Sequence, residues 1–303
     1  MSGVSTVIAA LDEELHIGRA VAAARPLGPV FVVDGGSSDG TRRIAEEAGA
    51  TVVEHFWEGY AAQKNWALLH LSFGTGWVLS LDADEIVTPA LRAEIAHAIE
   101  SETIAGYWLP RRNVFLGRVL RHAWWYPDYQ LRLFRVERGR FEDRLVHEHV
   151  LVEGETGFLR EPLVHENLKG IDAFVARQLR YAGLEAEEMR RARGGPVPNQ
   201  RQGKLFGTWP ERRRALKTRV WYRLPGKPLI RFLWMYVLKR GFLDGQEGRI
   251  YCELLAVSES LISAKQLEQE AAVVERGVRR RGTHPRRRPV STKSLRPRRS
   301  TEL

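Results

Sequence analysis

The chain begins with a regular alternation of short apolar runs and amphipathic segments, which limits the folds that it can adopt. The apolar runs lie at residues 4–10, 30–33, 51–53 and 77–81, and the segments with helical spacing at 13–24, 41–48, 60–71 and 89–100. Short apolar runs between turn signals are typical of buried strands. Consecutive strand–helix units of this length predict a mostly parallel, doubly wound α/β sheet with helices on its faces.

Acidic residues follow three of these runs, where the strands are expected to end. Asp12 follows the first run, Asp34 the second, and Asp82-Ala83-Asp84 the fourth. In open parallel sheets, ligands bind beyond the carboxyl ends of the strands. The sequence therefore predicts a ligand site at this edge, because an ordinary α/β core would scatter its acids over solvent-facing helices.

The triplet Asp82-Ala83-Asp84 has the form D-x-D, and two carboxylates one residue apart at a strand end can reach one ion. Mg²⁺ and Mn²⁺ prefer hard oxygen ligands and usually share them with substrate phosphates. A structural alternative stays open, in which Asp84 and Glu85 favour the start of the following helix. The glycine-rich loop at 35–40 matches neither G-x-G-x-x-G nor the P-loop pattern, which disfavours dinucleotide-binding and P-loop folds.

The pattern changes after residue 106. Strands are expected at 107–110 and 130–136, helices at 171–193, 229–242 and 250–267, and a turn-rich connector at 194–207. We therefore expect an α/β domain at 1–165, a helical region at 166–275 and a basic tail at 276–303.

The net charge of +10 is concentrated in the segment 276–303, which carries eleven Lys and Arg residues against the single acid Glu302. A segment rich in Pro, Arg and Ser is expected to be disordered. Three roles stay open for it: a solvated tail, attraction to an anionic membrane surface, and binding of RNA or DNA. Nucleic-acid binding is disfavoured, because a globular nucleic-acid binder would carry its basic patch on the fold.

Compartment and membrane signals are few. The single Cys252 excludes a disulfide within the chain and fits a reducing, cytoplasmic compartment. No secretory signal is recognised, and the apolar stretch at 229–238 is too short for a transmembrane helix. The segment 229–240 mixes large apolar, Trp and Tyr residues with cations, which suits the boundary of a membrane. The alternative is an amphipathic helix packed on the core or in a dimer contact.

Several segments, taken together, resemble the family 2 glycosyltransferases, which have the GT-A fold. The matching segments are Thr-Val-Ile-Ala-Ala-Leu-Asp-Glu-Glu at 6–14, Val-Val-Asp-Gly-Gly-Ser-Ser-Asp-Gly-Thr at 32–41, Gln-Lys-Asn at 63–65, and Leu-Ser-Leu-Asp-Ala-Asp-Glu at 79–85. Further on, residues 125–135 and 146–148 resemble the subgroup that contains lipopolysaccharide core β-1,4-glucosyltransferases. The resemblance then weakens towards residue 270.

The resemblance implies an inverting transfer of a sugar from a nucleotide-sugar donor, with a UDP-hexose expected, and Mg²⁺ or Mn²⁺ as cofactor. Residues 1–100 would form the donor half of the domain and 101–165 the acceptor half. The expected metal ligands are Asp84, Asp82 and His147, with His149 and His165 as weaker candidates. The expected donor contacts are Ala10, Leu11, Asp12, Glu14, Asp34, Lys64, Asn65, Asp82, Arg132 and Arg135. The family usually has Asn at the position of Asp12, so this chain departs from the pattern there.

An inverting transfer also needs a base for the acceptor hydroxyl. Asp128 is the first candidate, because it follows Pro127 in an aromatic loop where desolvation would raise its pKa, and Glu148 is the second. A structural role stays open for several of the candidate site residues. Asp34 and Asp128 could be turn residues, Arg132 and Arg135 could lie on a solvated strand face, and Lys64 and Asn65 could lie on a helix surface.

The acceptor is expected to be a saccharide or lipid-linked molecule of cell-envelope synthesis, reached by a peripheral enzyme at the cytoplasmic face of the membrane. A polyprenyl-phosphate sugar transferase would share the donor half. Two readings from other classes stay open: a nucleic-acid-associated protein acting through its tail, and a binding protein without catalysis.

Overall fold

The computed structural model describes residues 3–124, 126–142, 144, 148–193, 206, 212, 215–216, 221 and 224–282; within these, it gives only the helical backbone of 192–193 and 272–282. The predicted residues His147 and Trp125, the connector at 194–205 and the tail at 283–303 lie outside this description.

The first hundred residues form the predicted parallel α/β unit. Its strands are β1 (Val4–Ala10), β2 (Val30–Asp34), β3 (Thr51–Glu54) and β4 (Trp77–Asp82), and its helices are α1 (Ile17–Ala24), α2 (Thr41–Glu47), α3 (Tyr60–His70) and α4 (Pro89–Ala98). The strands lie in the order β3-β2-β1-β4, all parallel. This order is the one that right-handed strand–helix–strand crossovers produce in doubly wound sheets.

The second half of the domain extends this sheet with antiparallel and mixed pairs. Its strands are β5 (Glu85–Val87), β6 (Ile104–Phe115), β7 (Arg118–Val119), β8 (Asp128–Arg135), β11 (Glu155–Phe158) and β12 (Leu163–Glu166), while β9 (Gly139–Phe141) and β10 (Val150–Val152) pair separately. β8 runs antiparallel between β4 and β6. Most of these strands are too short, and too mixed in polarity, to stand out in the sequence.

The core lies on both faces of the sheet, which explains why β1, β2 and β4 are mostly apolar. Ile8 and Ala10 of β1 pack with α1, α2 and α4 on one face. Val7, which points the other way, packs with α3 and with Phe141 and Val150 of β9 and β10 on the other face. Alternate residues of a strand point to opposite faces, so a sheet covered on both sides buries them all.

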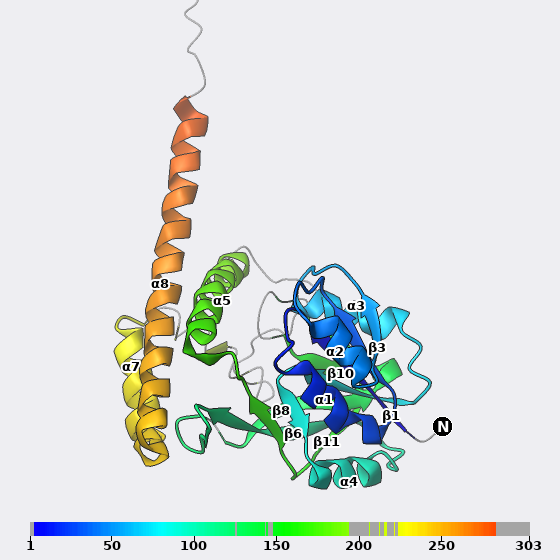
Figure 1. The fold of residues 1–303 in the computed structure, drawn as a ribbon. Coiled ribbons are helices and arrows are strands. Elements are labelled where there is room, and N and C mark those ends of the chain that lie inside the picture. Colours follow the sequence, from blue (N-terminus) through cyan, green and yellow to red (C-terminus); the bar gives the residue numbers. More distant parts are fainter. Residues whose placement is uncertain are drawn as a thin grey trace, which may run out of the picture.

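The helical region forms a separate layer beside the sheet (Figure 1). Its elements are α5 (Gly170–Arg193), α7 (Lys227–Leu233), the π-helical η4 (Trp234–Leu238), η5 (Gly241–Asp244) and α8 (Gly245–Gly282). α5 and α7 both pack against α8. A third apolar cluster, with Leu120, Met235 and Tyr251 among its members, joins these helices to the loop that precedes β8.

Two helical boundaries differ from the sequence-based expectation. The single helix expected at 229–242 breaks at Arg240, whose φ of 59° lies in the left-handed region. The helix expected to end at 267 continues as α8 to Gly282, inside the segment expected to be a disordered tail. Arginine is a good helix former, so its composition allowed this extension. No helix among the described residues is both long and apolar enough to span a bilayer.

Candidate active site

Three strands end level with one another at one edge of the sheet, where the acidic residues lie. The register pairs Ala10 with Asp34 and Ala9 with Asp82, which aligns the ends of β1, β2 and β4. β12 pairs antiparallel with β5 and brings His165 opposite Glu85 at the same edge. The structure therefore gathers the predicted acids at one place and adds residues from two short strands.

A line of alternating charges crosses this edge and joins the two halves of the domain. We call it the charge ladder; its members, in spatial order, are Glu148, Lys64, Asp82, Arg132, Glu85, Arg111 and Asp128. Lys64 Nζ lies 2.8 Å from Glu148 Oε1 and 3.0 Å from Asp82 Oδ1. Arg132 Nη2 contacts Asp82 Oδ2 and lies 2.7 Å from Glu85 Oε1. Four acids against three bases leave the ladder one negative charge in excess.

Arg111 joins Glu85 to Asp128 at the end of the ladder. Its Nη1 lies 3.4 Å from Glu85 Oε1, and its Nη2 and Nε lie 2.8 Å and 3.1 Å from Asp128 Oδ2. Glu85 is completely buried, and the guanidinium groups of Arg132 and Arg111 both lie against its carboxylate. The ladder therefore joins strand ends whose charges could not be buried singly.

The ladder shifts the pKa values of Asp82, Lys64, Arg111 and Arg132 towards the charged forms. Burial raises the pKa of Asp82, but attraction from Arg132 and Lys64 outweighs burial and holds that pKa well below its usual value. Burial lowers the pKa of Lys64, and Asp82 and Glu148 more than reverse this, so that pKa lies above its ordinary value. These groups are therefore charged at neutral pH.

Asp84, the second acid of the D-x-D triplet, stands beside the ladder and faces a histidine. His165 Nε2 lies 3.2 Å from Asp84 Oδ2, and Asn167 Nδ2 donates to the same oxygen at 3.2 Å. Burial raises the pKa of Asp84, but the attraction of His165 and its hydrogen bond outweigh burial. The pKa of Asp84 therefore lies below its ordinary value. On its other side, His165 Nδ1 lies 2.8 Å from Asn113 Oδ1. His165 is therefore held between Asn113 and Asp84, with Nε2 facing the carboxylate.

The donor set here fits a divalent ion that completes its coordination with phosphate oxygens. Among the described residues no hydrogen bond reaches Asp84 Oδ1, and His165 adds an imidazole nitrogen. Each oxygen of Asp82 accepts a hydrogen bond from a cation of the ladder, and the role of Asp82 as a metal ligand stays a prediction. No group of three His, Cys, Asp or Glu side chains in the described part of the chain is arranged to hold a metal alone. Mg²⁺ commonly binds through one or two protein ligands plus substrate phosphates.

Asp34 is completely buried and structures its own loop. Its Oδ2 accepts hydrogen bonds from the backbone N–H groups of Gly36, at 3.1 Å, and Ser37, at 3.0 Å, and its Oδ1 accepts from the Ser37 hydroxyl. Gly35 N donates to Ala10 O at 2.8 Å and ties this loop to the end of β1. The turn role left open by the sequence is therefore present, and the nucleoside contact of Asp34 stays a prediction.

The first loop is held against the second by paired backbone contacts. Asp12 adopts a φ of 54° and accepts from Ser38 N at 2.7 Å. Asn and Asp are the residues that tolerate this left-handed conformation best, so Asp12 can take the backbone conformation that suits the usual Asn. Glu14 accepts a hydrogen bond from Gly40 N at 2.9 Å. Leu11 is half-buried. These residues shape the loops beside the strand ends.

Two of the predicted donor contacts point elsewhere. Arg135 pairs in register with Trp77 at the opposite end of β4, donates to Ser101 O at 2.7 Å and to Ile104 O at 3.1 Å, and lies over the Trp77 ring. The expectation that Arg135 approaches the donor does not agree with this position, because a strand carries successive residues away from its end. Asn65 brackets Phe141 by two hydrogen bonds, of 3.1 and 2.8 Å, and fixes β9 on α3.

Asp128 lies at the start of β8 and is oriented by several donors. Besides Arg111, Trp124 Nε1 donates to Oδ2 at 3.2 Å and Gln130 Nε2 to Oδ1 at 2.9 Å. The Trp124 ring stacks on Tyr251 of α8 with 5.0 Å between centroids. Sequence reasoning selected Asp128 and the aromatic loop but missed Arg111, whose only signal was its place in a strand opposite that loop.

A buried aspartate fastens this loop to the helical region. Asp244 of η5 accepts hydrogen bonds from the backbone N–H groups of Arg121, His122 and Ala123 at 3.1, 2.8 and 2.7 Å. Burial raises the pKa of Asp244, but the hydrogen bonds from the backbone and from His122 outweigh burial, so this pKa lies below its usual value. We call this contact the Asp244 clasp.

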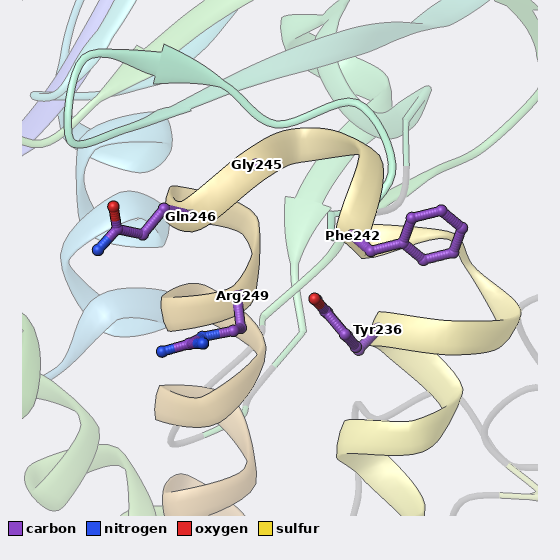
Figure 2. A pocket seen from close by; sticks show the side chains of 5 residues that line it. All are labelled: Tyr236, Phe242, Gly245, Gln246 and Arg249. Carbon is purple, nitrogen blue, oxygen red and sulfur yellow. The ribbon is translucent and has the colours of Figure 1, made fainter.

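A hollow of about 260 Å³ lies away from the strand ends, where η4, η5 and α8 meet. Tyr236 and Phe242 line one side of it and Gln246 and Arg249 of α8 the other, with Gly245 at the turn (Figure 2). It is separate from the charge ladder and does not extend the candidate active site.

Comparisons with known proteins were made on the whole chain. Residues 5–163 match the family described as Glycosyl transferase family 2. The chain is 29% identical over 261 residues to the lipopolysaccharide core biosynthesis glycosyltransferase LpsC of Rhizobium meliloti (strain 1021), covering 84% of this chain and 90% of that protein. It is 36% identical over 271 residues to an uncharacterized glycosyltransferase of Rickettsia conorii (strain Malish 7), covering 85% and 87%. A solved structure of mannosyltransferase PcManGT from Pyrobaculum calidifontis, in complex with GDP-Man and Mn²⁺, is 18% identical with a TM-score of 0.48, covering 87% and 86%. From the match over more than half of its length, this chain belongs to glycosyl transferase family 2.

Proposed function

We propose that this glycosyltransferase moves a hexose from a nucleotide-sugar donor, with a UDP-sugar as the preferred class, and inverts the configuration at the transferred carbon. The observation that carries the proposal is the Asp84–His165 pair at the edge where β1, β2 and β4 end together. Ligands of open α/β sheets bind at this edge. The charge ladder supports it, because it fixes the strand ends around the pair.

Asp84 and His165 would hold Mg²⁺ or Mn²⁺ together with the donor's phosphate oxygens. When bound, the ion neutralises charge on the departing diphosphate as a Lewis acid. The first loop, from Ala10 to Glu14, and Asp34 would contact the nucleoside through the shape that their hydrogen bonds give them. Lys64 and Arg132 would act at a distance, by keeping Asp82 charged and in place.

Asp128 is the proposed base for the acceptor hydroxyl. Its Oδ2 is held by Arg111 and Trp124, whereas Oδ1 accepts only from Gln130 among the described residues, which leaves Oδ1 a free lone pair for a proton. A fixed carboxylate within reach of the hydroxyl fulfils the geometric requirement for general-base catalysis. Glu148 is the second candidate, since its Oε1 accepts from Lys64 and no hydrogen bond from the described residues reaches Oε2.

The proposed acceptor is a saccharide or lipid-linked molecule of cell-envelope polysaccharide synthesis, reached from the cytoplasmic face of the membrane. The relationship to LpsC supports this class. A polyprenyl phosphate is the alternative acceptor, because the donor half would be the same for both.

The helical region supports docking on an anionic membrane surface. Leu229, Leu233 and Val237 are all exposed and follow one another at helical spacing along α7 and η4, with exposed Phe242 after the turn. Arg240 is exposed beside them, and the hollow of Figure 2 adds Arg249. An apolar row flanked by cations is typical of helices that lie in the membrane interface.

The donor and metal are tested by thermal shift of the purified chain with a panel of nucleotide sugars, with Mn²⁺ or with EDTA. One UDP-sugar is expected to stabilise the native protein more strongly with metal than with EDTA, and Asp84→Asn and His165→Ala are expected to abolish that difference. His97→Ala, at an exposed histidine, is the matched control. Absence of a metal-dependent shift with every nucleotide sugar would refute the proposed function.

A further inference from the structure

Helix α5 faces the candidate active site along one side, although it lies outside the segment that matches the family. Arg177 Nη1 approaches Asp84 Oδ2 at 3.8 Å, and one helical turn later the Tyr181 hydroxyl donates to the Tyr60 hydroxyl at 3.3 Å. Residues four apart lie on the same face of a helix, about 6 Å apart along its axis. α5 therefore presents a single face to the edge of the sheet.

This face continues through aromatic rings to the loop after Asp34. Tyr60 packs edge-on against Trp57 with 4.9 Å between centroids. The Trp57 ring in turn covers Gly35, so closely that a Cβ there would lie 2.8 Å from a ring carbon. Tyr181 also lies near the ladder: burial, then the neighbouring Tyr60, raises the pKa of its phenol, and the charge of Asp82 adds to this. The contacts of α5 thus run from Asp84, the proposed metal end, to the loop proposed to hold the nucleoside.

Arg177 is the cation on this face whose hydrogen-bonding capacity is unused. Its described contacts are the loose approach to Asp84 and a position over the Phe174 ring, 5.7 Å from its centroid. Among the described residues it makes no hydrogen bond within ordinary distance. A guanidinium carries five N–H donors in a planar fork that matches phosphate oxygens. The ladder's arginines, in contrast, are committed to buried carboxylates.

We propose that α5 forms a wall of the donor site and that Arg177 binds the diphosphate of the donor directly. The inference rests on the proposed function, because it needs a nucleoside diphosphate beside Asp84. Arg177 then stabilises the charge that accumulates on the leaving group, in addition to the contribution of the metal. The pairing of Tyr181 with Tyr60 holds α5 at the distance that this contact requires.

The test compares the affinities of UDP, GDP and UMP, measured by titration calorimetry with Mn²⁺ and again with EDTA. Arg177→Ala is expected to weaken binding of the preferred nucleoside diphosphate by about 10- to 100-fold, the usual effect of losing a charge-assisted hydrogen bond. The monophosphate of the same base should lose less than about threefold, since it lacks the outer phosphate. Arg177→Lys should retain part of the affinity, and melting without ligand checks that each variant is folded.

Arg180→Ala is the matched control, because Arg180 lies on the exposed face of the same helix. It should bind like the native protein. The loss in Arg177→Ala should persist with EDTA, since Arg177 acts on the phosphates and not through the ion. Diphosphate affinity within about twofold of the native value, or a loss that disappears with EDTA, would overturn the inference. If the native protein binds no nucleoside diphosphate, the proposed function fails, and this inference fails with it.

Discussion

Replacing Arg132 by Met removes an interior cation of the charge ladder while nearly preserving the volume of the side chain. The variant leaves Asp82 and Glu85 without the guanidinium that joins them. Removing one partner of a buried ion pair usually costs about 3–5 kcal/mol. Asp82 keeps Lys64 at 3.0 Å and Glu85 keeps Arg111 at 3.4 Å, so we expect the lower end, about 3 kcal/mol.

This loss is measured by urea unfolding of the native and Arg132→Met proteins, followed by circular dichroism. The midpoint should fall with an unchanged slope, and the melting temperature should fall by roughly 6–12 °C. Arg43→Met is the matched control: the Arg43–Glu47 pair is exposed on α2, and its loss should cost only about 0.3–0.5 kcal/mol. If Arg132→Met costs no more than Arg43→Met, the ladder does not stabilise the strand ends and the reasoning is wrong.

The same pair of proteins gives a pH dependence with a defined sign. The folded-state pKa of Asp82 is depressed well below its ordinary value of 3.8, so its contribution to stability is present above that value and is lost as the pH falls through the folded pKa. The stability gap between native and Arg132→Met should therefore be constant from about pH 8 to pH 5 and narrow below about pH 4. A gap that widens on acidification would contradict the assignment of Asp82 as the charged partner.

Two further outcomes follow from the site and the helical region. Asp128→Asn should leave the neighbouring side chains in place, because the amide oxygen can face Arg111 while Gln130 reorients. Turnover, measured as nucleoside diphosphate released with an acceptor saccharide, should fall about 10²- to 10⁴-fold at unchanged UDP affinity. Turnover within threefold of the native value would exclude Asp128 as the base. Leu233→Glu combined with Val237→Glu should lower co-sedimentation with phosphatidylglycerol vesicles about tenfold or more; unchanged sedimentation would place docking elsewhere.

The sequence predicted the parallel half of the sheet well, because its strands are buried on both faces and its helices are periodic. β1, β2 and β4 begin and end within a residue or so of the predicted runs. The D-x-D triplet begins at the end of β4, where its place after an apolar run predicted it. These signals are local, so they can be recognised without the fold.

The partners of those residues could not be predicted in the same way. Arg111 of β6 and Glu85 of β5 meet although β12 lies between their strands, and nothing in their sequence spacing indicates this contact. His165 was expected to be a weaker metal-ligand candidate than His147. The antiparallel pairing of β12 with β5 nevertheless places His165 against Asp84. Arg135 was an expected donor contact, but its pairing with Trp77 places it at the opposite end of β4 from Asp82.

The Asp244 clasp makes the two regions of the chain interdependent as evolving units. The loop that leads to Asp128 takes its backbone conformation from a carboxylate contributed by the helices some 120 residues later, at separations of 121 to 123 positions. A chimera that joined this sheet domain to the helices of another family member without that carboxylate would leave three backbone donors unsatisfied and the loop unanchored. Exchanging either region alone would therefore disturb the geometry of the loop that leads to Asp128.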